Sequence, residues 1–310
     1  MKILVTGGTG FLGKYLVKKI LRNKVTIFSR KAGKKFRGVK FVSGDITSIG
    51  NLEKAFPADV VVHLAATLDE YEPDLFKINV GGTKNVVELC KKYNVKQLIH
   101  MSSTAAIGET RFATENSQRN PKSRYEKSKR DAEDVVTNSG LNYTIIRAPV
   151  IMGPSDVWLG ILKLAKKKFP VIGKGNNCFH VAYVDDVAAI IVKSIGNKKA
   201  YGQVFHVATN DSPTYKEFYN MLCKSLGIEM TKKHIPVPLA KMASILHETT
   251  SKIRGKRPKF ILARSNINRL VRDRKVSTKR AKSVLGFTPK YNTKRAIEET
   301  VNYFKKSGLI

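Results

Sequence analysis

The sequence predicts an α/β fold in which a doubly wound parallel sheet is joined to a smaller, mostly helical domain. At the start of the chain a short apolar run leads through a glycine-rich loop into an amphipathic helix, and strand-like runs then alternate with helical segments. In the second half, prolines interrupt the helices. Because ligands of such sheets bind beyond the carboxyl ends of the strands, we expect the functional residues to follow the strands directly.

The glycine-rich loop lies between an apolar strand at residues 3–5 and the helical periodicity of residues 14–22. Gly7 permits the tight turn, Gly10 lets the backbone approach a pyrophosphate and Gly13 permits close helix packing, while free N–H groups at the helix start attract phosphates. An ordinary glycine-rich turn is the weaker interpretation, since the three elements follow in the order that dinucleotide binding requires. The predicted cofactor contacts of the loop are Gly7, Thr9, Gly10, Phe11, Leu12 and Gly13.

The order of the later elements divides the chain into two domains. Strands are predicted over residues 25–28, 39–42, 60–64, 97–101 and 143–147, with helices over about 74–93 and 124–138. Residues 184–187 are predicted to be a strand that returns to the main domain with a helix cap, where Asp185 and Asp186 are structural. We expect a dinucleotide-binding domain of residues 1–150 plus about 178–210, and a substrate-binding domain of residues 151–177 plus 211–310.

The residues that follow the strands indicate the cofactor. Ser29, Arg30 and Lys31 come after the second strand, where a protein that prefers NAD usually carries an acid for the ribose 2′-hydroxyl, so NADP is favoured over NAD. A solvated surface arginine is the alternative interpretation of Arg30. His63 and His100 are isolated within apolar strands and are expected in the core. Further predicted cofactor contacts are Asp45 and Ile46, at the adenine, and Leu64, Ala65 and Ala66.

Two Tyr-x-x-x-Lys pairs occur, and this spacing places both side chains of a pair on one helix face. Tyr15 and Lys19 lie in the helix after the glycine loop, whose side chains pack on the sheet or face water. Tyr125 and Lys129 instead lie in a helix that follows the fifth predicted strand, 22 residues after Ser103. Order and spacing therefore single out Tyr125 and Lys129 as the functional pair.

With these motifs the chain resembles the extended short-chain dehydrogenase/reductase family, also called the NAD-dependent epimerase/dehydratase family, over most of its length. The resemblance implies a Rossmann sheet. Residues 275–289 are similar to the dihydroflavonol-reductase, sterol-dehydrogenase and nucleotide-sugar epimerase branches alike. Besides the glycine loop, the motifs on which the resemblance to the family rests are Gly44-Asp45-Ile46, His63-Leu64-Ala65-Ala66, Asn79, Ser102-Ser103, Tyr125 with Lys129, Arg147-Ala148-Pro149, Gly153-Pro154 and Val184-Asp185-Asp186-Val187-Ala188.

The resemblance implies that Tyr125 is the acid/base of the reaction, which agrees with phenol chemistry because a nearby cation favours the phenolate. Lys129 would supply that charge and reach the nicotinamide ribose. Ser103 would orient the substrate oxygen, with Ser102 and Thr104 as alternative hydroxyls. Two further implied positions are Asn79, which would hold the active-site backbone in shape, and Pro149, which would abut the nicotinamide.

The expected function is that of an NAD(P)-dependent oxidoreductase that transfers hydride between a nicotinamide and a ketone or secondary alcohol. A sugar-nucleotide 4-epimerase or dehydratase is the alternative, because the same residues serve reactions in which the hydride returns to the substrate. A non-catalytic protein that binds the cofactor or a polyanion is the alternative from another class.

Composition bounds the remaining alternatives. The 310 residues include 57 Lys or Arg and 24 Asp or Glu, which gives a net charge of +33. The three cysteines, Cys90, Cys178 and Cys223, lie far apart and suggest neither a disulfide framework nor a metal site. Because no apolar run is long enough for a signal peptide or a membrane span, a cytoplasmic protein is expected.

The positive charge is densest over residues 252–282, where Asp273 is the one acid among thirteen basic residues. Three interpretations stay open: a solvated basic surface, a patch that faces an anionic substrate, or a docking site for nucleic acid or an anionic membrane. We expect a small-molecule substrate, anionic or neutral, and no specific nucleic acid, because no element is shaped to read bases. A homodimer also stays open.

Overall fold

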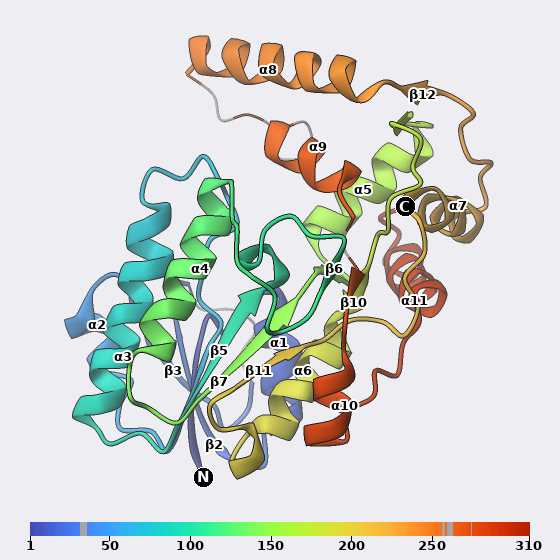
Figure 1. Ribbon diagram of the computed structural model, residues 1–310. Helices are drawn as coiled ribbons and strands as arrows, with labels where there is room; N and C mark the ends of the chain where they lie inside the picture. Colours follow the sequence, from blue (N-terminus) through green and yellow to red (C-terminus); the bar gives the residue numbers. More distant parts are fainter. Residues whose placement is uncertain (32–35, 256–257, 259–262, 274) are drawn as a thin grey trace.

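The computed structural model describes residues 1–31, 36–255, 258, 263–273 and 275–310. Within these residues, seven parallel strands form the main sheet in the order β3-β2-β1-β4-β5-β7-β11 (Figure 1). The strand order reverses at β1 and β4, so the predicted doubly wound, Rossmann-like sheet is confirmed. The strands are β1 (Lys2–Thr6), β2 (Lys24–Ser29), β3 (Lys40–Ser43), β4 (Val60–His63), β5 (Gln97–Ser103), β7 (Tyr143–Ala148) and β11 (Gln203–His206).

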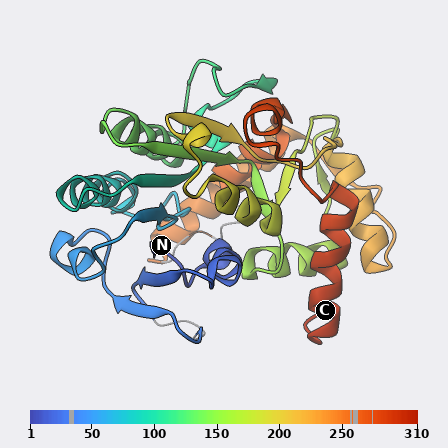
Figure 2. The same cartoon turned by 90° about the horizontal axis from the view of Figure 1, so that it is seen from below.

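Helices cover both faces of the sheet (Figure 2). Because successive side chains of a strand point to opposite faces, Ile3 and Val5 pack on one side and Leu4 on the other. On the first side lie α1 (Phe11–Ile20) and α6 (Val184–Ser194). On the second lie α2 (Ile49–Glu53), α3 (Gly82–Lys92) and α4 (Arg124–Thr137). Burial on both faces explains why a central strand such as β4 is an almost continuous apolar run, whereas the edge strand β3 is largely exposed.

The segments outside this layered core lie largely beyond the carboxyl ends of the strands or beside the sheet (Figure 1). Three short parallel strand pairs tie together segments that are distant in sequence: β8 (Val150–Met152) with β10 (Val181–Tyr183), β9 (Val171–Ile172) with β12 (His234–Ile235), and β6 (Phe112–Ala113) with β13 (Lys275–Val276). The division into two domains stays a prediction. The remaining helices are α5 (Asp156–Lys166), α7 (Tyr215–Leu226), α8 (Val237–Ile253), α9 (Arg264–Val271), α10 (Lys279–Leu285) and α11 (Thr293–Lys306).

The helix predicted over residues 74–93 is divided in the structure. A π-helical turn at Lys77–Gly81 precedes α3, and Asn79 is buried inside this wide turn. The Thr83 hydroxyl donates to the Asn79 carbonyl at 2.6 Å. The π-helical turn therefore directs the polar side chain of Asn79 into the interior. Helical periodicity in the sequence did not reveal this orientation.

The strand predicted over residues 184–187 is wrong, because these residues form the first turn of α6 and the preceding strand, β10, ends at Tyr183. Asp185 and Asp186 stand in that turn, where carboxylates favour the positive end of the helix dipole. Asp186 accepts the backbone N–H groups of Lys290 and Tyr291 at 2.9 and 3.1 Å. Its role is therefore structural, as expected.

His63 and His100 are confirmed as core residues, since they are 1% and 2% exposed and their rings lie 5.3 Å apart. In the described part of the chain, no helix is both long and apolar enough to cross a membrane. Within the basic segment 252–282, the residues Lys256, Arg257, Lys259 and Arg274 lie outside the described residues.

Candidate active site

A cavity of about 1060 Å³ lies beyond the carboxyl ends of the strands. The structure brings to its wall every residue that the sequence assigned to catalysis or to the cofactor. They are Gly7, Thr9, Gly10, Phe11, Leu12, Gly13, Arg30, Asp45, Ile46, Leu64, Ala65, Ala66, Ser103, Tyr125, Lys129 and Pro149.

The glycine loop has the compact backbone that a bound dinucleotide requires, because two of its positions leave no room for a side chain. Gly7 has a φ of +72°, and a Cβ at Gly13 would lie 2.5 Å from the Gly7 carbonyl oxygen, so neither position accepts a side chain without strain. Gly10 caps α1 with no side-chain hydrogen bond, so no side chain satisfies the first N–H groups of the helix. Such free N–H groups at a helix start are suited to bind a pyrophosphate.

At the end of the cavity where the sequence predicts the adenosine, short hydrogen bonds order the polar groups. Thr9 and Ser29 share a hydrogen bond of 2.7 Å between their hydroxyls. The Asp45 carboxylate accepts from both the N–H and the hydroxyl of Thr47 at 2.8 Å, and the backbone N–H in particular lowers the pKa of Asp45. Asp45 is therefore charged at neutral pH, and the exposed Arg30 lies near it on the same wall.

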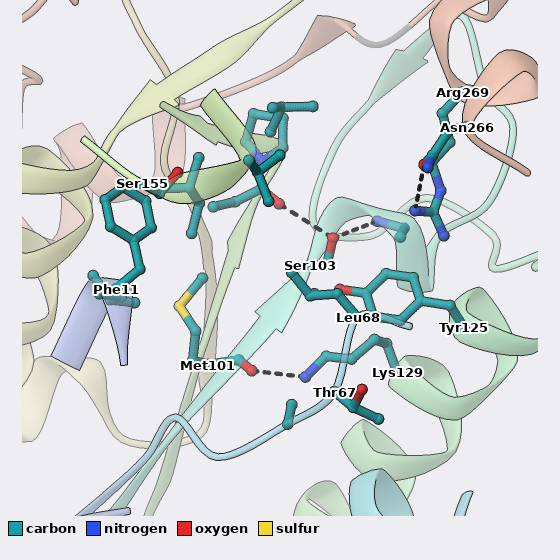
Figure 3. A pocket seen from close by; sticks show the side chains of 18 of the residues that line it. Phe11, Thr67, Leu68, Met101, Ser103, Tyr125, Lys129, Ser155, Asn266 and Arg269 are labelled. Carbon is teal, nitrogen blue, oxygen red and sulfur yellow. Dashed lines mark hydrogen bonds between the residues drawn. The ribbon is translucent and has the colours of Figure 1, made fainter. Parts of the chain in front are cut away.

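Ser103 and Tyr125 meet at the centre of the cavity (Figure 3). Ser103 is the last residue of β5, and its hydroxyl accepts from the Ala105 N–H at 3.1 Å and donates to the Ala148 carbonyl at 3.4 Å. Tyr125 is the second residue of α4, a helix that begins with a capping box of Ser123 and Glu126. Burial raises the pKa of Tyr125, whereas Arg269 and the neighbouring Ser103 hydroxyl lower it.

Lys129 lies one helical turn after Tyr125 on the same face of α4 (Figure 3). Its ammonium donates to the Met101 carbonyl at 2.8 Å, and its side chain is almost fully buried. Because burial disfavours a charge, the pKa of Lys129 falls to about 8. Lys129 thus lines the cavity with an ammonium whose pKa burial lowers.

Arg269 is a residue of the site that sequence reasoning missed. It comes from α9, and its guanidinium lies 4.9 Å from the centre of the Tyr125 ring, where it lowers the pKa of Tyr125. A carboxylate oxygen of Glu70 lies 3.5 Å away, and Asn266 accepts from Arg269 at 3.2 Å. The sequence assigned the cation beside the phenol to Lys129, but the structure places Arg269 over the ring as well.

Arg272 also reaches the cavity from the basic segment 252–282. It forms ion pairs with Glu109 at 3.3 Å and with Glu126 at 3.4 Å. Arg269 and Arg272 are therefore part of the pocket wall rather than of a solvated surface. The density of basic residues indicated the segment, but no motif related these two to Tyr125.

Asn79 fixes the loop after β4 against α4. Its amide nitrogen donates to the Thr67 carbonyl at 3.1 Å and to the Ser128 hydroxyl at 3.0 Å, and its amide oxygen accepts the Thr67 N–H at 2.8 Å. Thr67 lines the cavity beside Tyr125 and Lys129. Asn79 thus has contacts suited to the positioning role that the resemblance implies.

The half of the cavity away from the glycine loop is largely apolar and aromatic. It is formed by α5, α7, α9 and the segments that join them, and Phe179 lies 4.7 Å from Phe218 between ring centres. Such a lining can enclose a large apolar ligand. The residues are Trp158, Ile161, Leu164, Phe169, Ile172, Phe179, Tyr215, Phe218, Tyr219, Leu222, Ile267 and Leu270.

Ser102 differs from Ser103 in its surroundings. Its hydroxyl is buried and has no hydrogen-bond partner within the described residues, although the residue borders the cavity. Ser103, by contrast, lies beside Tyr125, and its hydroxyl lowers the pKa of that phenol (Figure 3). The placement of Ser103 beside Tyr125 is compatible with the predicted choice of Ser103 over Ser102, which stays a prediction.

Known proteins resemble this chain over almost its whole length. The yeast Saccharomyces cerevisiae sterol-4-alpha-carboxylate 3-dehydrogenase, decarboxylating, is 32% identical and covers 96% of each chain. The Escherichia coli O157:H7 N-acetyl-alpha-D-glucosaminyl-diphospho-ditrans,octacis-undecaprenol 4-epimerase is 26% identical, covering 97% of this chain and 94% of its own.

Solved structures of epimerases also resemble this chain over almost its whole length. UDP-glucose 4-epimerase from Thermotoga maritima has a TM-score of 0.79 at 25% identity, with 99% of both chains covered. UDP-glucuronic acid 4-epimerase from Bacillus cereus, in complex with NAD, has a TM-score of 0.78 at 22% identity and the same coverage. The sequence model of the NAD dependent epimerase/dehydratase family matches residues 3–208 of this chain. The chain therefore belongs to the NAD dependent epimerase/dehydratase family, and it is an enzyme of the extended short-chain dehydrogenase/reductase type.

Proposed function

We propose that the enzyme oxidises a secondary alcohol of a large, mostly apolar substrate to a ketone, or catalyses the reverse reduction, with Tyr125 as acid/base. The observation that carries the substrate class is the aromatic and aliphatic lining beyond Ser103 and Tyr125. The base and ribose of a nucleotide-sugar would need several polar partners there, and most of this lining offers apolar surface.

The names of two relatives support this substrate class. One acts on a sterol carboxylate and the other on a sugar carried by an undecaprenol chain, and both substrates have a long apolar part. Arg269 and Arg272 place two guanidinium groups in the cavity wall close to Tyr125 and Glu126, each also paired with a carboxylate, and this supports a substrate with an anionic group near the reacting carbon.

The residues around Tyr125 have the geometry for proton transfer at the substrate oxygen. In oxidation, the Tyr125 phenolate takes the hydroxyl proton while Ser103 hydrogen-bonds the same oxygen, and the C–H bond breaks as the C=O bond forms. A bound NAD(P) supplies the hydride acceptor for oxidation and the hydride donor for reduction. Lys129, buried one turn from Tyr125, holds the cofactor ribose and stabilises the phenolate by its charge.

We propose that NADP binds more tightly than NAD, although solved structures of the fold contain NAD. Arg30 and Lys31 line the adenosine end, and no acid follows β2. Arg30→Ala should weaken NADP binding by roughly five- to tenfold, because an exposed arginine contributes modestly, and should leave NAD binding unchanged. Titration calorimetry with both cofactors measures this. Equal affinities of the wild-type protein for NADP and NAD would contradict the proposed preference for NADP.

The pH profile of oxidation should depend on Arg269. Tyr125 is faced by Arg269 of α9, by Glu126 and Lys129 of its own helix, and by Glu70 of the loop after β4. Burial raises the pKa of Tyr125 and Arg269 opposes this shift, so Arg269→Gln should move the acid limb of kcat/KM to higher pH. Arg264→Gln, exposed on the same helix, is the control. An unmoved acid limb in Arg269→Gln would show that this cation does not act on the phenol.

The substrate class is tested by measuring turnover of three compounds in separate assays. Two are 3-hydroxysterols, one with and one without a carboxylate on the neighbouring carbon, and the third is a UDP-hexose. We expect turnover of the sterols and faster turnover of the carboxylated one. Ile161→Lys places a charge in the apolar half and should lower kcat/KM for sterols by about tenfold or more with cofactor binding unchanged. Lys163→Glu, exposed on the same helix and outside the cavity wall, should change neither. Conversion of the UDP-hexose alone would contradict the proposal.

A further inference from the structure

An apolar surface lies on α8, a helix of which no residue lines the cavity. We call it the outward face of α8, and in the described part of the chain no other helix or strand exposes as many large apolar side chains. The exposed fractions are 50% for Leu239, 55% for Met242, 45% for Ile245, 61% for Leu246 and 79% for Ile253. In Figure 1, α8 forms the outer edge of the molecule, with α9 between it and the body of the protein.

The pattern of α8 is the reverse of that of a helix that only packs on its own protein. Its buried residues are small: Ala240, Ser244 and Ser251. Each is followed two positions later by a large apolar residue, Met242, Leu246 or Ile253, and two residues correspond to about 200° around a helix. The small side chains therefore face α9, and the large ones point away from the protein. A helix of this kind needs an apolar partner on its outer side.

Charge indicates which partner. Lys241, Lys252 and Arg254 are exposed on or at the end of α8. The one acid of the helix, Glu248, is engaged inward, since its carboxylate accepts from the Tyr71 hydroxyl at 2.6 Å and from the Arg264 N–H at 2.7 Å. A second copy of this chain, also with a net charge of +33, would be repelled. An anionic bilayer offers both an apolar interior and negative headgroups.

We propose that the outward face of α8 inserts into the surface of a membrane that contains anionic lipid, with the helix lying in the plane of the interface. Its apolar side chains enter the boundary between headgroups and acyl chains, and its basic side chains meet the headgroups. The absence of a membrane-spanning helix among the described residues is compatible with this, because an interfacial helix does not span.

Docking in this way would place the apolar end of the cavity near the bilayer. Ala240 of α8 packs with Ile267 of α9 and Ile172, and the latter two also line the cavity. A substrate dissolved in lipid would then have a short path to the site. The docking itself rests on the surface and charge of α8 and not on the proposed substrate.

Flotation of the full chain with lipid vesicles tests the proposal. The protein should float with vesicles of phosphatidylcholine and phosphatidylserine, and much less with phosphatidylcholine alone. The triple variant Met242→Ser, Leu246→Ser, Ile253→Ser should lose roughly tenfold or more of the bound fraction, since the apolar face is removed. Leu21→Ser, directly after α1, and Tyr303→Ser, on α11, alter exposed apolar residues elsewhere on the protein and should bind as the wild type does.

Three further readouts separate the outcomes. Because the substituted side chains are exposed, the triple variant should keep its circular dichroism spectrum, cofactor affinity and turnover of a detergent-dissolved substrate. Lys241→Glu with Lys252→Glu should also weaken flotation. Equal flotation of the triple variant and the wild type would overturn the proposal, because general positive charge would then suffice. A wild-type oligomer that the triple variant converts to monomers would overturn it in favour of a protein interface.

Discussion

Tyr125→Phe should lower kcat by about 10² to 10⁴, the range that general acid/base catalysis contributes, and should leave cofactor binding nearly unchanged. The substitution removes one oxygen from a ring that is only 6% exposed, so the packing of α4 is retained. That oxygen lies beside Ser103 in the wall of the cavity (Figure 3). Steady-state kinetics in both directions, with a titration of cofactor fluorescence, measure the two constants.

Tyr15→Phe is the matched control, since Tyr15 belongs to the other Tyr-x-x-x-Lys pair. Tyr15 contacts Phe11, and burial raises its pKa to about 12, which keeps the phenol protonated. We expect Tyr15→Phe to retain wild-type turnover. Loss of turnover in Tyr15→Phe with retention in Tyr125→Phe would mean that the wrong pair was chosen.

Lys129→Met should damage both turnover and cofactor binding. The ammonium lies one turn from Tyr125 with a pKa of about 8, and a charged hydrogen bond to a ribose contributes about 1.5–3 kcal/mol. We therefore expect cofactor affinity to fall by at least about tenfold, and kcat by about a hundredfold through the lost stabilisation of the phenolate. Both constants come from the assays used for Tyr125→Phe.

Lys19→Met is the control for this prediction, because Lys19 is the lysine of the other pair and forms an ion pair with Asp185 at 2.8 Å. It should leave kcat and cofactor affinity unchanged. If Lys129→Met kept the wild-type kcat and cofactor affinity, Lys129 would have no part in catalysis or cofactor binding.

The strand ends explain why so much of the candidate site could be predicted. In a parallel sheet the carboxyl ends of β1, β2, β4, β5 and β7 meet at one edge, so residues that follow them in sequence gather in space. Gly7, Arg30, Ala65, Ser103 and Pro149 line one cavity for this reason. Their chemical roles stay predictions until the variants are measured.

Arg269 could not be predicted because nothing local relates it to Tyr125. The two residues are far apart in sequence, and the contact between them depends on how α9 packs over the carboxyl end of the sheet. The same holds for the outward face of α8. The sequence contains its apolar stripe, but only packing against α9 reveals that the small residues, not the large ones, face inward.

The error at residues 184–187 has a local cause. Residues 184–187 read Val-Asp-Asp-Val and follow directly on the apolar strand β10, which ends at Tyr183, so this short stretch is ambiguous between a continued strand and the start of a helix. The run of apolar residues that continues to Val192 at helical spacing decides for α6. Element boundaries at such a junction depend on where the first helical turn is stabilised, here by Asp185 and Asp186 near the helix N-terminus.

The fate of the hydride tests the proposed reaction most directly. A secondary alcohol with deuterium on the carbinol carbon is incubated with the enzyme and NADP or NAD, and the released cofactor and the product are analysed by mass spectrometry. We predict that the deuterium appears in free reduced cofactor, in equal amount to the ketone formed, and that Tyr125→Phe stops both. Deuterium that returns to the substrate with an inverted carbinol centre, while the cofactor stays bound, would contradict a dehydrogenase and establish the epimerase reaction.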